Sequence, residues 1–382
     1  MTSKVVFTIE GKKFYGERKL SEASSFTVQS VPRPYTVDID SAADPCKKIN
    51  KQLAENKNNL LLIDENIYKL YKDRLHLSKE KTYIAKATEG FKNIDGVMSV
   101  VDFLQKNAMT KGEKLIVVGG GIIQDVGAFV GVCYKRGIPW VYFPTTLLSM
   151  CDSCIGGKAG INHGHAKNQL ALFSAPSRVI INPRFLLTLP AEAIDSGMGE
   201  VLKLFIIGGG PYVDIFNRYT VNGKARSFSS YKPLILAALS VKKAVIEVDE
   251  FELNYRRSLN YGHTIGHAVE VLSGYRIPHG QAVSMGAIIV NALSARRSLL
   301  KNAERKKLNT LLFSLISPRI LKKMRQIKAD TIGELFKKDK KTLGNTVNIA
   351  IIAKAGDTRI LPLLIDAQLV SEIEHIMQEE FR

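Results

Sequence analysis

The stretch KLIVVGGGIIQDVGAFVG, residues 114–131, decides the fold class of this chain. A run of apolar residues is followed by three consecutive glycines and then by a pattern typical of a helix. Such a strand, turn and helix let the backbone approach a pyrophosphate, which rests on the amides at the start of the helix. The spacing is GGGxxxD and not GxGxxG, so on its own the turn is equally compatible with a structural role.

The neighbouring segments favour a parallel sheet. The apolar runs LLLID (60–64) and WVYFPTT (140–146) alternate with helix-like stretches between about residues 59 and 190. Asp64 ends the first run, where its carboxylate could accept hydrogen bonds from a ribose hydroxyl. In the usual dinucleotide fold that acid follows the glycines by about 20 residues. We therefore expect a Rossmann-like variant.

The character of the chain changes after residue 190. AEAIDSGMGEVLKLFII (191–207) opens a series of long amphipathic segments with few strand signals. We expect an α/β fold in two domains. Residues 1–190, including an N-terminal lead-in, would form a Rossmann-like parallel-sheet domain, and residues 191–382 an α-helical domain.

The formal charge of +18 raises the question of a nucleic-acid partner. Much of the excess lies in LLKNAERKKL (299–308) and in the segment 320–341, where lysines alternate with apolar residues at helical spacing. This pattern is typical of solvated helix faces, so we expect no nucleic-acid partner. A basic surface also suits a phosphorylated, carboxylated substrate.

Several features indicate a cytoplasmic protein without a membrane partner. No apolar run approaches the roughly 18 residues of a membrane helix, and MTSKVVFTIEGKKFYG (1–16) lacks the apolar core of a signal peptide. The four cysteines are too few and too scattered for a disulfide framework. Cys151 and Cys154 form a single CxxC without a second ligand pair, which favours packed side chains over a zinc site.

Histidines and one acidic residue suggest a metal site. His263 and His267 are four residues apart and share a helix face, and His279 follows shortly after. Glu200 and Lys203 would share a face of another helix. One glutamate with two histidines is a known catalytic zinc set. The spacing does not decide which two histidines bind metal, and a structural histidine pair remains the alternative.

Ten blocks of sequence, in this order and spacing, resemble 3-dehydroquinate synthase and its sugar-phosphate cyclase relatives. The resemblance covers roughly residues 60–345 and implies a homodimer that uses NAD and Zn²⁺, with Co²⁺ as a possible substitute. It also implies that residues 1–190 are the NAD domain and residues 191–382 the metal and substrate domain. The blocks are VVGGGIIQDVGAF (117–129), KRG (135–137), PTTLL (144–148), DSCIGGKAGIN (152–162), KN (167–168), GMGEVLK (197–203), VDEFE (248–252), RRSLNYGHTIGHAVE (256–270), HGQAVSMG (279–286) and DKK (339–341).

The resemblance assigns roles residue by residue. It implies that Glu200, His263 and His279 bind the metal ion and that His267 serves in proton transfer. The other implied catalytic residues are Asp152, Lys203, Arg256 and Asn260. The implied substrate-binding residues are Lys158, Asn168, Lys242, Lys340, Lys341 and, from the second subunit, Arg136. The implied cofactor-binding residues are Asp64, Lys92, Gly120, Gly121, Asp125, Thr145, Thr146, Lys158, Lys167 and Thr188.

The implied reaction is a cyclisation with transient oxidation. NAD would take a hydride from a substrate hydroxyl, phosphate would leave, the hydride would return, and the opened enol would close as an aldol. Arg256, Asn260 and Lys242 match the branch that acts on a carboxylated sugar, so we expect 3-deoxy-arabino-heptulosonate 7-phosphate as substrate. A charge-assisted contact contributes about 1.5 to 3 kcal/mol.

Two other activities remain open. ATEGFKN (87–93), KNQLALFSAP (167–176) and Asn182 depart from the family pattern, which suggests a cyclase of another heptulose phosphate, such as sedoheptulose 7-phosphate, in a secondary or surface-sugar pathway. A metal-dependent alcohol dehydrogenase of the glycerol dehydrogenase type shares the broad architecture. The GGK and KN blocks, which would bind phosphate, argue against that second activity.

Overall fold

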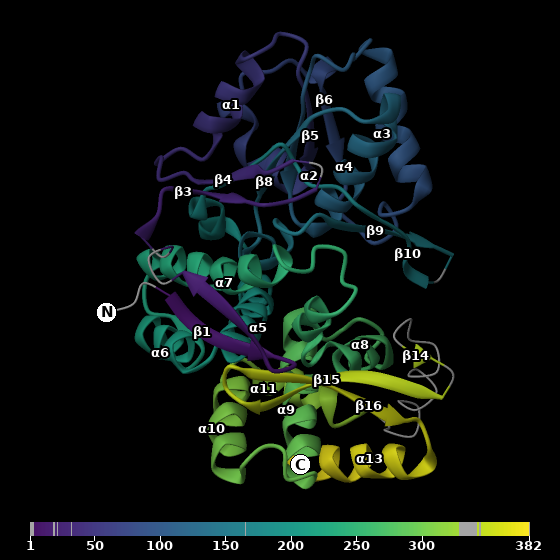
Figure 1. The fold of residues 1–382 in the computed structure, drawn as a ribbon. Helices are drawn as coiled ribbons and strands as arrows, with labels where there is room; N and C mark the ends of the chain where they lie inside the picture. The colour runs from purple at the N-terminus through teal and green to yellow at the C-terminus, as the bar shows by residue number, and fades with distance from the viewer. Residues whose placement is uncertain are drawn as a thin grey trace. The chain divides into compact units, whose positions relative to one another are not determined.

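A computed structural model describes residues 4–17, 20, 22–31, 33–164, 166–327, 342–343 and 345–381. The chain divides into two compact units, which are residues 22–190 and residues 1–21 together with 191–382. The first is called the sheet unit and the second the helical unit. Figure 1 shows the elements of both.

The sheet unit contains a seven-stranded sheet in which all neighbouring strands are parallel except the first pair. Its strands, in spatial order, are β3 (Ser25–Val28), β4 (Tyr35–Ile39), β11 (Arg178–Ile181), β8 (Trp140–Pro144), β7 (Leu115–Gly119), β5 (Leu60–Asp64) and β6 (Thr82–Ala85). Its helices are α1 (Cys46–Ala54), α2 (Glu65–Tyr71), α3 (Ile94–Lys106) and α4 (Gly121–Cys133).

The three apolar runs of the sequence are the central strands, as predicted. Every residue of β5, β7 and β8 is buried, which is typical of parallel strands covered on both faces. Helix α4 follows β7 directly and packs closely on the sheet. A Cβ added at Gly127 would lie 2.8 Å from Val117, and one at Gly131 would lie 2.8 Å from Trp140. These glycines therefore let α4 approach the strands.

Short elements complete the sheet unit. The strands β9 (Lys158–His163) and β10 (Ala166–Phe173) form an antiparallel hairpin, and β9 packs against α4. The single-turn helices are η2 (Lys72–Arg74), η3 (Lys79–Lys81), η4 (Tyr134–Arg136), η5 (Ser149–Ser153) and η6 (Pro183–Thr188).

The helical unit is built on α5 (Ala191–Gly208), as predicted from the segment after residue 190. Its other helices are α6 (Gly210–Tyr219), α7 (Tyr231–Ile246), α8 (His263–Leu272), α9 (His279–Arg296), α10 (Asn302–Phe313), α11 (Pro318–Met324) and α13 (Ala367–Phe381), with the single turns η7 (Phe228–Ser230) and η8 (Tyr255–Asn260). Helix α9 is the core of the unit, because fifteen of its residues, Gly280–Ser294, are buried.

The predicted domains and the units of the structure differ in two respects. The helical unit also holds a five-stranded sheet, and the first strands of the chain belong to it and not to the sheet unit. The reason is a distant pairing, because the N-terminal hairpin joins the C-terminal hairpin through parallel pairing of β1 with β16 (Figure 1). The strands, in spatial order, are β14 (Thr342–Leu343), β15 (Thr346–Lys354), β16 (Asp357–Leu364), β1 (Lys4–Ile9) and β2 (Lys12–Glu17), and a separate pair is β12 (Thr220–Val221) with β13 (Lys224–Ala225).

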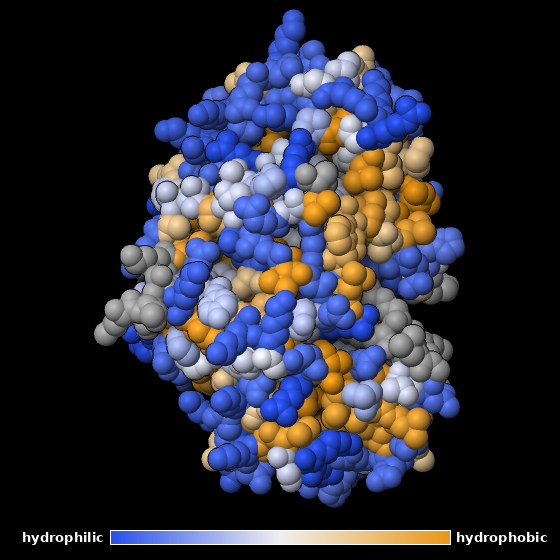
Figure 2. All heavy atoms as spheres, in the orientation of Figure 1, coloured by the Kyte–Doolittle hydropathy of each residue, from blue (hydrophilic) through white to orange (hydrophobic). Residues whose placement is uncertain are grey.

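Hydrophilic residues cover most of the face shown in Figure 2, with hydrophobic residues gathered where Figure 1 draws α3 and the β9–β10 hairpin. Exposed apolar side chains on these elements are Ile94, Met98, Leu170 and Phe173. These four residues are called the apolar patch. Among the described residues, we find no helix that combines the length and apolar character needed to span a bilayer.

Candidate functional site

Three helices of the helical unit approach one another through glycines. A Cβ added at Gly199 of α5 would lie 2.2 Å from the carbonyl oxygen of Gly280 on α9. A Cβ added at Gly286 of α9 would lie 2.0 Å from the carbonyl oxygen of Gly262, which precedes α8. Real side chains cannot fit in such gaps, so the backbones meet only because these positions lack a Cβ.

This close approach brings the predicted ligands together, because Glu200 follows Gly199 and His279 precedes Gly280. Glu200 Oε1 lies 3.5 Å from His263 Nε2 and 3.2 Å from His279 Nε2. The second oxygen, Oε2, lies 2.5 Å from Lys203 Nζ one turn along the same helix. Glu200 and Lys203 are both buried, at 1% and 3% exposure.

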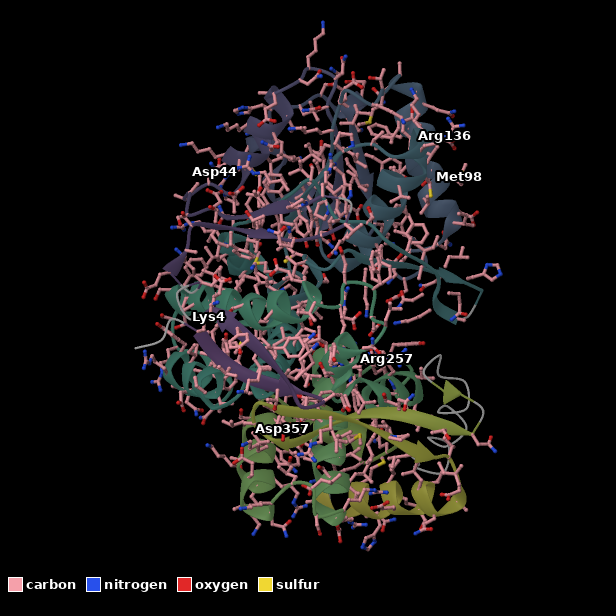
Figure 3. The ribbon with its side chains drawn as sticks, in the orientation of Figure 1. Lys4, Asp44, Met98, Arg136, Arg257 and Asp357 are labelled. Atoms are coloured by element: carbon pink, nitrogen blue, oxygen red, sulfur yellow. The ribbon has the colours of Figure 1, made fainter. Side chains whose placement is uncertain are left out.

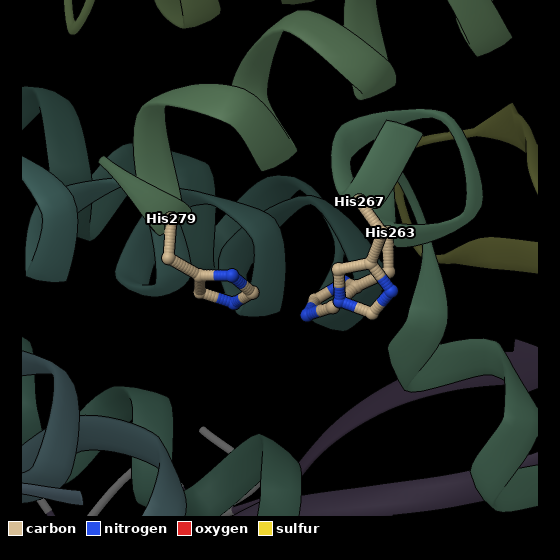
Figure 4. A group of neighbouring side chains, drawn as sticks. All are labelled: His263, His267 and His279. Carbon is tan, nitrogen blue, oxygen red and sulfur yellow. The ribbon is translucent and has the colours of Figure 1, made fainter. Parts of the chain in front are cut away.

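The three imidazoles form a cluster, shown in Figure 4. His263 and His267 come from α8 and His279 from the first residue of α9, and one ring nitrogen of each lies within 4.8 Å of the others. His267 is the most exposed of the three. The structure thus places Glu200 and all three predicted histidines in one small region.

The nitrogens that face away from Glu200 have partners of their own. His279 Nδ1 lies 3.0 Å from Glu270 Oε2, and His263 Nδ1 lies 3.3 Å from the carbonyl oxygen of Tyr261. Acceptors at these positions favour a proton on Nδ1, which leaves each Nε2 directed toward Glu200. Metal-binding histidines are commonly held in this way.

The charge of the cluster also suits a cation. Burial lowers the pKa of His279, but hydrogen bonds and charges from Glu200 and Glu270 outweigh this effect and raise that pKa to about 10. Two carboxylates therefore favour positive charge at this point. One carboxylate and two imidazole nitrogens match the donor set of a zinc-type ion, so the residues present fit a divalent metal.

A tight loop before α8 holds Arg256. Its anchor is Asp249, whose carboxylate accepts hydrogen bonds from the backbone N–H groups of Leu253, Asn254 and Arg256 at 2.9, 2.8 and 2.9 Å. Burial alone would raise the pKa of Asp249, but these three donors and the Arg256 charge hold it below its usual value. The Arg256 side chain is 2% exposed and donates to the carbonyl oxygen of Glu250.

The structure describes two of the other predicted substrate residues of this unit, Asn260 and Lys242. Asn260 ends η8, and its Nδ2 donates to Glu252 Oε1 at 2.8 Å. Lys242 is buried on α7, at 6% exposure. Lys340 and Lys341 lie outside the described residues.

In the sheet unit, the glycine turn opens α4 as predicted. Within the described residues, α4 has no side-chain cap, and an added Cβ at Gly121 would meet open space. Uncapped amides with free space beside them fit a bound pyrophosphate. At Gly120, an added Cβ would approach Thr146 to 3.0 Å.

The remaining predicted nucleotide positions lie around the carboxyl ends of the strands. Asp64 ends β5, and its Oδ1 accepts from the Asn66 amide at 2.7 Å. Thr145 is buried, and its amide donates to Gly119 at 3.0 Å. Thr188 lies at the end of η6, 3.4 Å from the Tyr71 hydroxyl. Asp64 is thus already engaged as the cap of α2.

A polar cluster joins α4 to the hairpin. Lys92 Nζ lies 2.6 Å from Asp125 Oδ2, where burial raises the pKa of Asp125 and the Lys92 charge opposes that rise. Glu89 accepts from Lys167 Nζ at 3.1 Å and from Asn162 Nδ2 at 2.8 Å. The structure thus brings three predicted cofactor residues, Lys92, Asp125 and Lys167, into one polar region.

The predicted phosphate-facing residues are exposed on the sheet unit. Lys158 begins β9, and Asn168 on β10 has a left-handed backbone with φ 54°, its amide donating to Asn162 at 3.0 Å. Arg136 has φ 61° and follows Lys135 with φ 49°. Two consecutive left-handed residues cost about 1 kcal/mol or more each, which is typical of functional turns. Asp152 is half-buried in η5.

Sequence reasoning missed Glu89, Glu252 and Glu270. They lie in the segments 87–93, 248–252 and 256–270, but their partners come from other segments. For Glu270 a signal existed, because it lies three residues after His267 and therefore on the histidine face of α8.

Comparisons with known proteins find relatives over most of the chain. A model of the 3-dehydroquinate synthase N-terminal domain matches residues 82–196, and a model of the C-terminal domain matches residues 197–342. The 3-dehydroquinate synthase of Pelagibacter ubique (strain HTCC1062) is 37% identical over 325 residues, which are 81% of this chain and 87% of the relative. The chain belongs to the 3-dehydroquinate synthase family. Its activity is that of a sugar-phosphate cyclase.

Several solved structures share the fold. 2-Deoxy-scyllo-inosose synthase superposes with a TM-score of 0.77 at 18% identity, covering 93% of this chain and 99% of the other, and has also been solved with carbaglucose-6-phosphate, NAD⁺ and Co²⁺. 2-Epi-5-epi-valiolone synthase from Streptomyces hygroscopicus subsp. jinggangensis 5008, with NAD⁺ and Zn²⁺ bound, superposes with a TM-score of 0.72 at 22% identity, covering 91% and 96%.

Proposed function

We propose that this chain converts 3-deoxy-arabino-heptulosonate 7-phosphate to 3-dehydroquinate with release of phosphate, using NAD and a divalent metal ion. One observation carries most of the proposal. In a member of this family, the Glu200 carboxylate faces the Nε2 atoms of His263 and His279 at 3.5 and 3.2 Å. The related cyclases solved with NAD⁺ and Zn²⁺ or Co²⁺ support both cofactors.

Glu200 Oε1 and the two Nε2 atoms are the proposed metal ligands. The ion would supply Lewis acidity, which lowers the pKa of a bound hydroxyl, and NAD would supply a reversible hydride acceptor. Lys203 holds the other oxygen of Glu200 and so fixes the direction of the carboxylate. The buried Lys203 ammonium is also proposed to orient a substrate hydroxyl.

His267 is the proposed proton-transfer residue. Its ring lies in the imidazole cluster but is more exposed than the rings of His263 and His279. Neutral imidazole both accepts and donates a proton near neutral pH. His267 is therefore suited to moving a proton at the substrate while the other two histidines hold the ion.

Arg256, Asn260 and Lys242 are the proposed binding residues for the carboxylate and hydroxyls of the substrate, together with Lys340 and Lys341. Arg256 supports this assignment because a guanidinium at 2% exposure is stabilised by an anion close to it. The loop anchored by Asp249 holds the Arg256 backbone in place. A substrate without the carboxylate would leave this buried charge without that ligand.

The sheet unit is proposed to hold NAD and the phosphate end of the substrate. NAD would rest on the uncapped start of α4, near Gly120, Gly121, Lys92 and Asp125. The further proposed NAD residues are Asp64, Thr145, Thr146, Lys158, Lys167 and Thr188. The proposed phosphate and substrate residues are Lys158, Asn168, Asp152 and, from a second subunit, Arg136.

A homodimer is part of the proposal. The apolar patch on α3 and β10 is exposed, with Met98 at 48% and Leu170 at 43%. Exposed apolar surface of this kind often marks an interface. Figure 3 labels Met98 and the exposed Arg136 on this same unit. A dimer would cover the patch and allow Arg136 to reach a neighbouring active site.

A cytoplasmic location completes the proposal. The four cysteines are all described and all free, and Cys133 is exposed. Unpaired cysteines fit a reducing compartment.

A two-substrate assay tests the proposed reaction. Purified protein with NAD and Zn²⁺ should release phosphate from 3-deoxy-arabino-heptulosonate 7-phosphate, and a chelator should abolish the release. Sedoheptulose 7-phosphate should react at least about tenfold more slowly, because Arg256 then lacks its charge-assisted contact. No phosphate release from the carboxylated sugar would overturn the proposal.

The departures near Lys92 and in β10 favour one second candidate. A cyclase of an uncarboxylated heptulose phosphate would share the metal and NAD residues and differ at the Arg256 loop. Preferred turnover of sedoheptulose 7-phosphate in the same assay would establish this candidate in place of the first.

A further inference from the structure

The His279 ring has a carboxylate on each side. Its Nε2 atom lies 3.2 Å from Glu200 Oε1, and its Nδ1 atom lies 3.0 Å from Glu270 Oε2. The two ring nitrogens point in different directions, so an ion held by Nε2 and Glu200 is out of reach for Glu270. Glu270 therefore touches the ring without competing for the ion.

The helix packing explains how Glu270 reaches this ring. His263, His267 and Glu270 share one face of α8, at spacings of four and three residues. Helix α9 lies close against that helix, because an added Cβ at Gly266 would lie 2.9 Å from the carbonyl oxygen of Ala282. The first residue of α9 is His279, so its ring falls beside the Glu270 carboxylate.

We propose that Glu270 is a positioning residue that orients His279 and so strengthens divalent-ion binding. This inference rests on the proposed function. By accepting the Nδ1 proton, Glu270 keeps the Nε2 lone pair directed at the ion and makes the imidazole a better donor. His263 Nδ1 lies 3.3 Å from the neutral carbonyl oxygen of Tyr261, whereas the partner of His279 Nδ1 is a carboxylate.

The test measures ion affinity and not turnover. Zn²⁺ or Co²⁺ is titrated into the ion-free full chain against a chromogenic chelator. Glu270→Gln keeps the size of the side chain and one acceptor but loses the charge, and should weaken binding by about tenfold. Glu270→Ala loses both and should weaken it by up to about 100-fold. The Co²⁺ absorption spectrum should change in both variants, because the orientation of one ligand changes.

Glu372→Gln is the matched control. Glu372 is a similarly buried carboxylate of the same unit, 19% exposed against 13% for Glu270, and it pairs with Arg297 at 2.8 Å, away from the histidines. The control should keep wild-type affinity and spectrum. Thermal unfolding of the ion-free proteins separates loss of fold from loss of affinity. If Glu270→Ala fails to fold, the nearly isosteric Glu270→Gln decides the question.

Three outcomes overturn the inference. The first is that Glu270→Gln binds the ion as tightly as wild type, with an unchanged spectrum. The second is that the Glu372→Gln control loses affinity to the same extent. If the wild-type chain binds no divalent ion, the proposed function fails together with the inference. If it binds the ion and releases phosphate while Glu270→Gln binds equally well, only the inference fails.

Discussion

At the level of single side chains, the proposed contact of Arg256 with the substrate carboxylate gives the first prediction. Arg256→Ala should lower kcat/KM for the carboxylated sugar by roughly tenfold to 150-fold, since a charge-assisted contact contributes about 1.5 to 3 kcal/mol. Binding of Zn²⁺ and NAD should remain unchanged. Steady-state kinetics with both heptulose phosphates checks this result. Equal losses for the two sugars would contradict a role in carboxylate recognition.

Asp249 gives a prediction about pH. Its folded-state pKa is depressed by three backbone donors, so it stabilises the fold above its unfolded pKa of about 3.9 and that contribution is lost as the pH falls through the lower folded value. Asp249→Asn should remove this dependence and destabilise the protein at neutral pH by about 1.5 to 3 kcal/mol. Denaturant unfolding at neutral and acidic pH measures both effects. An acid limb as steep as that of wild type would rule out this assignment.

For single residues, the sequence predicts which side chains share a helix better than it predicts which side chains touch. The sequence predicted that His263 and His267 lie on one helix and that Glu200 and Lys203 lie on another. In the structure, α8 carries the first pair and α5 the second. The contact of Glu270 with His279 was not predicted, because it depends on how closely α8 approaches α9. The roles assigned to the site residues stay predictions until they are measured.

Among the elements, the crossing of α5 with α9 brings Glu200 close to His279. An added Cβ at Gly280 would lie 1.8 Å from the carbonyl oxygen of Ser196, so Gly280→Ala must push the two helices apart. We expect a loss of about 1 to 3 kcal/mol in the free energy of unfolding and weaker ion binding, because Glu200 and His279 separate. Thermal unfolding and chelator competition measure these effects.

Gly210→Ala is the control for this substitution. Gly210 lies at the start of α6, and an added Cβ there meets nothing within 4 Å. This variant should keep wild-type stability and ion affinity. Wild-type behaviour of Gly280→Ala would show that the helix crossing tolerates a methyl group and does not set the site.

Local patterns predicted elements well and distant pairings poorly. Strands β5, β7 and β8 were predicted because buried apolar runs between turns have few alternative structures. The sheet of the helical unit was missed because its strands come from opposite ends of the chain. No local pattern links Thr8 to Asp357, which pair in parallel between β1 and β16.

For the whole molecule, the proposed dimer depends on the apolar patch. Met98→Glu places a charge in this patch, where Met98 is 48% exposed, and should shift the protein to monomers. Leu364→Glu is the control, because Leu364 is 58% exposed and lies in the other unit. Sedimentation at several concentrations distinguishes them. A Met98→Glu dimer as stable as wild type would contradict the proposed interface.

Phosphate release should fall when the protein shifts from dimer to monomer. Arg136 is proposed to act across the dimer, so monomeric Met98→Glu should lose phosphate release while keeping its ion affinity. The Leu364→Glu control should retain both. A fully active monomer would show that Arg136 has no role across subunits.

The fold class and the family were predicted from the sequence, since ten ordered blocks leave few alternatives. The fold alone does not decide the chemistry, because one fold can host several activities. We propose that the residues of the metal cluster and the Arg256 loop decide it.

The most direct test follows phosphate and reduced nicotinamide together during one turnover experiment with 3-deoxy-arabino-heptulosonate 7-phosphate. A cyclase releases one phosphate per substrate and returns each hydride, so phosphate should accumulate with no net NADH, and removal of either NAD or the metal should stop it. Net NADH accumulation, or phosphate release that persists without both cofactors, would contradict the account.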